Sequence, residues 1–168
     1  GLVVSEDQTV TFVVQPYLDV KAEAYDATTK VLTVNITAKY DVVATTAKNL
    51  SVDDAIKLEG EDKNAVKMEE GKLLEVGTPI QLEITLPADF VTNESFIFVQ
   101  HEKGQSHYHQ AVITNDSSNK KASFTSEDGL SPFTFKAGAE MAAQIGGSYY
   151  ETLAEAVNAA TDGQTIVL

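Results

Sequence analysis

The chain has 168 residues, no Cys and a formal net charge of −13 at pH 7. This length suits one ordinary domain, or one domain plus a fragment. Without Cys there can be no disulfides and no thiolate metal sites.

The charged residues narrow the range of partners. Every basic residue is Lys, so the bidentate recognition of phosphate or guanine that Arg provides is excluded. The excess of acid repels nucleic acid and anionic lipid, and no apolar run is long enough to span a membrane. We therefore expect neither a nucleic-acid partner nor membrane contact.

Alternating apolar residues predict three strands in the first part of the chain. Residues 10–16 form a first strand that stops at Pro16, and residues 18–25 form a second, weaker one. The clearest is residues 32–40, which place Leu32, Val34, Ile36, Ala38 and Tyr40 on one face.

Residues 49–77 give an ambiguous pattern. One helical turn over residues 51–58 and a hairpin over residues 67–76, turning at Glu70-Gly71, are the predicted elements. The acidic groups Asp53-Asp54, residues 59–62 and Glu69-Glu70 lack the ligand ladder of a calcium loop, so we interpret them as a solvated surface.

Five further strands are predicted between residues 80 and 136. They are residues 80–86, 95–100, 108–114, 122–125 and 132–136, and the continuous apolar run at 95–100 predicts burial on both faces. Short strands about ten residues apart, with almost no helix, favour an antiparallel β-sandwich. Its predicted core comprises Leu32, Val34, Ile36, Ile80, Leu82, Ile84, Ile97, Val99 and Phe124.

The last 26 residues, AQIGGSYYETLAEAVNAATDGQTIVL, predict strand, turn, short strand, helix, turn and strand. Thr152 and Glu155 have capping-box spacing, and Leu153, Ala156, Val157 and Ala160 share one helical face. Residues 164–168 should either fold back beside residues 144–145 and 149–150 or pair with a neighbouring molecule, and we favour the first, with the chain returning parallel to the start of the unit. Because the chain ends within an apolar strand, it is expected to be part of a longer protein.

Two stretches carry a resemblance. IGGSYYETLAEAVNAATDGQTIVL resembles a segment of large bacterial, mainly Gram-positive, cell-surface proteins, where it often precedes a right-handed parallel β-helix. The series ITLPADF, FVQHEK and SFTSEDGLSPFTF resembles the closing half of an immunoglobulin-like module found in the same proteins. The resemblance implies an immunoglobulin-like sandwich at residues 1–138 and a truncated C-terminal ββαβ repeat unit at residues 139–168. Residues 1–78 are assigned to the sandwich by adjacency and strand pattern.

All three histidines, His101, His107 and His109, lie within nine residues. His107 and His109 share a strand face, and a third imidazole across the hairpin would complete a three-nitrogen zinc site. If Glu102 pairs with His107, His101 points to the opposite face; a register one residue different brings all three together. The pattern favours polar residues at a surface hairpin tip, so we expect no metal site and no cofactor.

No motif for nucleophilic catalysis or phosphate binding is present. Sugar binding would most plausibly use Tyr149 and Tyr150, although one of the two should pack inward. We therefore expect a non-enzymatic structural, spacer or adhesion module of a secreted or wall-attached protein, located at the cell surface and flanked by other domains. The alternative is a module that binds polysaccharide or a host surface protein within a larger extracellular protein, such as a glycan-degrading one.

Overall fold

The computed structural model describes residues 2–7, 9–47, 65–90, 93–116 and 119–168. The structure is mainly β, and its strands pair antiparallel. The chain divides into two compact units: residues 1–19 with 37–75, and residues 20–36 with 76–168. The predicted boundary between residues 138 and 139 stays a prediction.

The first unit contains β1 (Leu2–Val4) and β4 (Val66–Leu73), together with parts of β2 (Thr11–Asp26) and β3 (Val31–Thr45). The expectation of two strands separated at Pro16 is wrong, because β2 continues through that residue. Within the described residues, β1 pairs with Thr11–Val13, so Pro16 lies beyond that ladder and interrupts none of its hydrogen bonds. The predicted hairpin at residues 67–76 is also wrong: β4 is one strand, paired with β3.

The alternation along β3 confirms the predicted strand but shifts near its middle. Leu32, Val34, Ile36 and Ala38 are buried as expected, whereas beyond Tyr40 the buried face continues through Asp41 and Val43. Register shifts against β4 occur between Tyr40 and Val42 and again between Val42 and Val43. Such an irregularity inserts an extra residue and changes which side chains face inward. The predicted helical turn at residues 51–58 lies outside the described residues.

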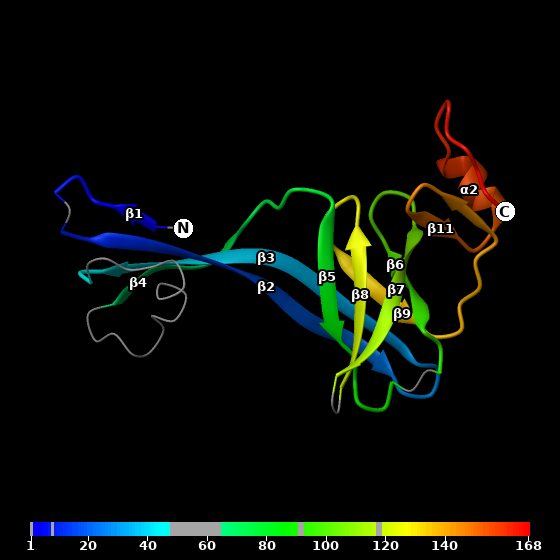
Figure 1. Ribbon diagram of the computed structural model, residues 1–168, viewed down its shortest axis with the longest axis horizontal. Coiled ribbons are helices and arrows are strands. Elements are labelled where there is room, and N and C mark those ends of the chain that lie inside the picture. Colours follow the sequence, from blue (N-terminus) through cyan, green and yellow to red (C-terminus); the bar gives the residue numbers. More distant parts are fainter. Residues whose placement is uncertain (1, 8, 48–64, 91–92, 117–118) are drawn as a thin grey trace. The chain divides into compact units, whose positions relative to one another are not determined.

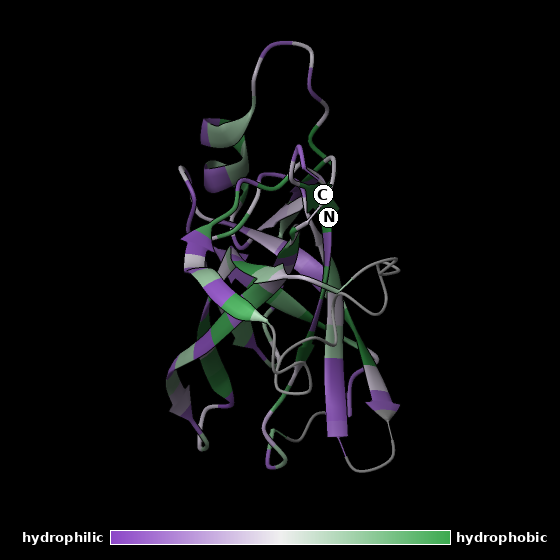
Figure 2. Cartoon of the chain, turned by 90° about the vertical axis from the view of Figure 1, so that its left-hand side faces the viewer, coloured by the Kyte–Doolittle hydropathy of each residue, from purple (hydrophilic) through white to green (hydrophobic). Residues whose placement is uncertain are grey.

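In the second unit, five strands and the first part of β3 form one continuous series of strand pairings. They are β5 (Ile80–Thr85), β6 (Phe96–His101), β7 (His107–Asp116), β8 (Asn119–Ser126) and β9 (Pro132–Lys136). Pairing gives the order β3-β9-β6-β7-β8-β5 (Figure 1). Apolar and polar bands alternate along the strands, as Figure 2 shows.

The core of this unit contains the predicted residues. All nine belong to one buried cluster, eight as members and Ile80 as a partly buried neighbour. The expectation that residues 95–100 are buried on both faces is wrong: Ile97 and Val99 are buried, whereas Phe96 is exposed. Aromatic side chains on the outer face of β6 account for the continuous apolar run.

The C-terminal residues of this unit form β10 (Ala143–Ile145), β11 (Ser148–Tyr150) and α2 (Leu153–Ala159) (Figure 1). β11 pairs with β7 at Tyr149 and Tyr108. The chain then returns to β10, as predicted, where Gln144 and Val167 exchange two backbone hydrogen bonds of 2.8 and 2.9 Å. That bridge is antiparallel rather than parallel, because the turn after α2 reverses the chain.

The helix has the predicted capping box, in which both the side chain of Thr152 and that of Glu155 bond to the backbone. Its buried face is narrower than expected. Ala156 is fully buried, whereas Leu153 and Val157 are exposed, so the short side chains make the contact with the strands. No helix of the described residues is long and apolar enough to cross a membrane.

Candidate metal centre

The hairpin of β6 and β7 brings the three histidines onto one face. His101 pairs directly with His107, and Val99 pairs with His109, so all three imidazoles point the same way. Their exposed fractions are 0%, 8% and 1% for His101, His107 and His109. The expectation of an exposed hairpin tip is therefore wrong. The histidines continue the inward face that Ile97 and Val99 begin.

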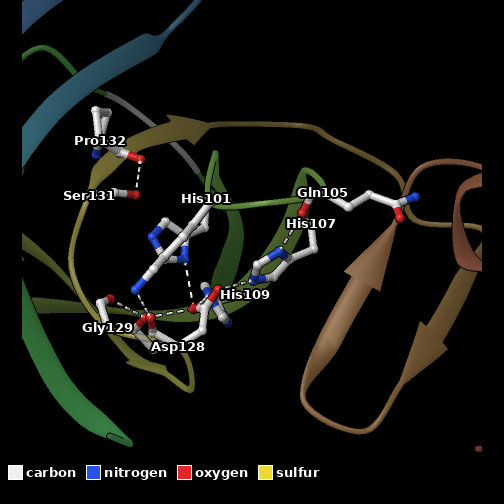
Figure 3. Close-up of polar contacts among 10 residues, drawn as sticks. His101, Gln105, His107, His109, Asp128, Gly129, Ser131 and Pro132 are labelled. Atoms are coloured by element: carbon white, nitrogen blue, oxygen red, sulfur yellow. Dashed lines mark hydrogen bonds and ion pairs between the residues drawn. The ribbon is translucent and has the colours of Figure 1, made fainter. Parts of the chain in front are cut away.

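A fourth group comes from the turn after β8. Asp128 places Oδ1 2.8 Å from His101 Nδ1 and 4.0 Å from His109 Nε2, and Oδ2 3.5 Å from His107 Nε2. One candidate ligand atom from each of the four residues lies within 4.8 Å of every other. Figure 3 shows the three imidazoles and the carboxylate converging.

The site contains ring nitrogens without hydrogen-bond partners. Among the described residues, neither nitrogen of His101 or of His109 has one, although all four atoms are buried. The short approach of Asp128 to His101 Nδ1 does not have the alignment of a hydrogen bond. Buried polar atoms normally have partners, so four orphaned nitrogens in one place require an explanation.

His107 is oriented by the backbone. Its Nδ1 lies 3.0 Å from the carbonyl oxygen of Gln105, which can only accept a hydrogen bond (Figure 3). Nδ1 therefore carries the proton, and the lone pair of Nε2 faces Asp128. Metal-binding histidines are commonly held in this way by a carbonyl behind the ring.

Burial favours the neutral form of His101 and His109. The pKa of His109 is lowered to about 4, mainly by burial and in smaller part by charge on His107 and His101, whereas Asp128 acts in the opposite direction. The pKa of His101 is also lowered, mainly by burial. Neutral imidazole is the form that binds a metal ion.

Aromatic side chains of the core support the histidine rings. His101 stacks on Phe133 of β9 at 4.3 Å between centroids, and His109 lies over Phe124 of β8 at 6.1 Å. These contacts limit the ring orientations. The site is thus built into the main core.

Sequence reasoning identified the three histidines but not Asp128, which lies between the predicted strands at residues 122–125 and 132–136. Nothing in local spacing links residue 128 to residues 101–109. Its position depends on the pairing of β8 with β7 and on the turn held by Ser126, whose hydroxyl donates to Gly129 O at 2.6 Å.

The two tyrosines proposed for sugar binding have different environments. Tyr150 is buried against β10 and α2, as expected for one of the pair. Tyr149 packs on Phe98 at 5.2 Å between centroids and donates a hydrogen bond to Gln110. It also lines an open groove of about 810 Å³, together with Phe96, Phe98, Val167 and Leu168 among others.

No protein-family model matches this chain, and neither does any curated protein or solved structure.

Proposed function

We propose that this chain is a non-catalytic module of an extracellular, cell-surface protein, consisting of an immunoglobulin-like sandwich and a C-terminal ββαβ repeat fragment. In this role it acts as a structural spacer or as part of an adhesin. The motifs LPADF, VQHEK and LSPFTF support the proposal through their resemblance to bacterial surface modules.

The structural observation that supports the sandwich part of the proposal is a contact across the core. Phe124 of β8 lies 5.2 Å from Phe133 and 5.8 Å from Phe135 of β9, measured between ring centroids. In the pairing order, β6 and β7 lie between β8 and β9. Inward-facing rings from non-adjacent strands meet when a sheet folds over and encloses its own core, as a sandwich does.

Binding assays on the purified chain test this function. The chain is immobilised and exposed to cell-wall and host polysaccharides and to host matrix proteins, and it is also incubated with ester and glycoside substrates. A spacer gives no saturable binding and no turnover. Turnover that survives repurification would contradict the non-catalytic proposal.

One observation favours the alternative, a polysaccharide- or protein-binding module. The groove beside Tyr149 combines the aromatic side chains of Phe96 and Phe98 with polar Gln144. Sites of this size commonly combine apolar walls with a few polar groups. Saturable binding that Tyr149→Ala and Phe96→Ala abolish, but Val112→Ala retains, would establish this alternative. Val112 is a suitable control because it is 53% exposed and is not among the groove-lining residues.

A further inference from the structure

We propose that His101, His107, His109 and Asp128 bind one Zn²⁺ ion in a closed, structural site. The site joins the β6–β7 hairpin to the turn that follows β8. It supplies three imidazole nitrogens and one carboxylate oxygen, a donor set and number typical of tetrahedral zinc. This site is independent of the spacer or binding role.

The spacing of the donors suits a small ion. Zinc–nitrogen bonds of about 2.0–2.1 Å place the ligands of a tetrahedron about 3.3 Å apart. The distances from Asp128 oxygens to the three histidines, 2.8, 3.5 and 4.0 Å, bracket that separation. One candidate ligand atom from each residue already lies within 4.8 Å of the others, so only small displacements separate them from a tetrahedral arrangement.

The donor types select the metal. Ca²⁺ and Mg²⁺ prefer oxygen ligands, whereas three imidazoles suit Zn²⁺ and similar transition metals. A zinc ion would also satisfy two of the orphaned nitrogens, one on His101 and one on His109. His107 already has its second nitrogen held by Gln105 O, which leaves Nε2 for the ion.

The burial of the site indicates a structural rather than a catalytic ion. Protein atoms would fill all four tetrahedral positions, and the Asp128 side chain, 36% exposed, is much more open to solvent than those of His107 at 10% and His109 at 2%. Catalytic zinc sites keep one position open for water or substrate. The ion would link β6, β7 and the turn after β8. It would add to the stacking of His101 on Phe133 and of His109 on Phe124.

Isothermal titration calorimetry of the full chain with Zn²⁺ near pH 7, after treatment with a chelator, tests the proposal. We expect one equivalent to bind with a micromolar or lower dissociation constant, and Mg²⁺ and Ca²⁺ to give no signal. Bound Zn²⁺ should raise the thermal midpoint, because a ligand of the native state stabilises it. Absence of saturable Zn²⁺ binding would overturn the proposal.

Asp128→Asn provides the first variant, since it keeps the shape of the side chain and removes its charge. It should weaken Zn²⁺ binding at least tenfold. Glu127→Gln is the matched control. It also removes one negative charge, but from an exposed side chain that is not among the four proposed ligands. Equal weakening in both variants, or none in Asp128→Asn, would contradict the assignment.

Wild-type protein supplies a second test that needs no substitution. The ¹⁵N resonances of the imidazole nitrogens should shift for all three histidines as one equivalent of Zn²⁺ is added. Co²⁺ in the same site should give the visible absorption of a tetrahedral complex. Zinc-dependent shifts confined to one histidine, or Co²⁺ absorption typical of octahedral water ligands, would also overturn the proposal.

Discussion

The imidazole of His101 stacks on the ring of Phe133, with centroids 4.3 Å apart and planes 17° from parallel. The two residues are direct partners in the β6–β9 ladder. A polar group and a core aromatic ring therefore share one cross-strand pair. Changes to the core at this position should affect both the stability of the fold and the geometry of the candidate metal centre.

Phe133→Ala should lower the free energy of unfolding by about 3–5 kcal/mol, the usual cost of removing a buried aromatic side chain. Phe133 is fully buried and contacts both His101 and Phe124. Urea unfolding followed by circular dichroism measures the change. An unfolding midpoint equal to that of the wild type would show that this ring is not part of the core.

Ile36→Ala and Ile84→Ala should each cost about 2–5 kcal/mol, because both side chains lie in the same buried cluster. Val112→Ala provides the control, since its side chain is 53% exposed and its loss should change stability by about 0.5 kcal/mol or less. The comparison uses the same urea titration. Equal effects at all three positions would argue against this core.

Acid should destabilise the metal-free protein before its carboxylates titrate. The folded-state pKa of His109, about 4, lies below the ordinary value of 6.5. The unfolded chain therefore takes up the proton first, so the stabilising contribution is complete above about pH 6.5 and is lost as the pH falls towards 4. The loss is about 3 kcal/mol.

Three charged or titratable groups face His109: His107, His101 and Asp128. Asp128 opposes the shift, and the two histidines reinforce it. Unfolding measured in chelator between pH 7.5 and 4, with NMR titration of the imidazole protons, checks the prediction. A His109 midpoint near 6.5 would mean that the ring is solvated.

Residues 141–168 should exchange their amide hydrogens at a lower opening free energy than the strands around Ile36 and Ile84. Their own apolar cluster is small, with Ala143, Ile145, Tyr150 and Ala156 as its buried members. Segments with few buried contacts open first. Equal protection of both regions would show that the C-terminal residues are integrated into the main core.

Tyr108 provides a polar link between this segment and the sheet. Its hydroxyl donates to Glu151 at 2.6 Å and accepts from Lys136 at 2.8 Å. Tyr108→Phe removes both bonds and should cost about 0.5–1.5 kcal/mol for each. Hydrogen exchange of β11 and α2 should accelerate more than that of β5. A uniform change across the chain would contradict a local role.

Thr152→Ala should destabilise α2 by about 0.5–2 kcal/mol, because it removes the hydroxyl that accepts from Glu155 N. The effect is measured as faster amide exchange at residues 154–158. Thr161→Ala, also exposed and just beyond the helix, serves as the control. Equal acceleration by the two substitutions would show that the capping box contributes little.

The parts of the fold that sequence predicted are those with strong local patterns. Period-two alternation identified β3 and β5, and Thr152 with Glu155 identified the start of α2. The continuity of β2 through Pro16 was missed because it depends on where β1 ends. Local spacing carries no information about such pairing.

The candidate metal centre shows the same limit. The histidines were visible in the sequence, but whether they share a face depends on the register that pairs His101 with His107. Asp128 joins them only through tertiary structure. The local sequence therefore shows which residues could be ligands, whereas strand register and tertiary contacts determine whether those residues meet.

The single bridge between Gln144 and Val167 has a mechanical consequence. A pull on Leu168 would first load these two backbone hydrogen bonds, then α2, and then the short ladder of β10 and β11. Each step extends the chain against few contacts, before tension reaches the strands that enclose the aromatic core. Under load, the last residues of this chain would act as a compliant extension in series with a stiffer sheet.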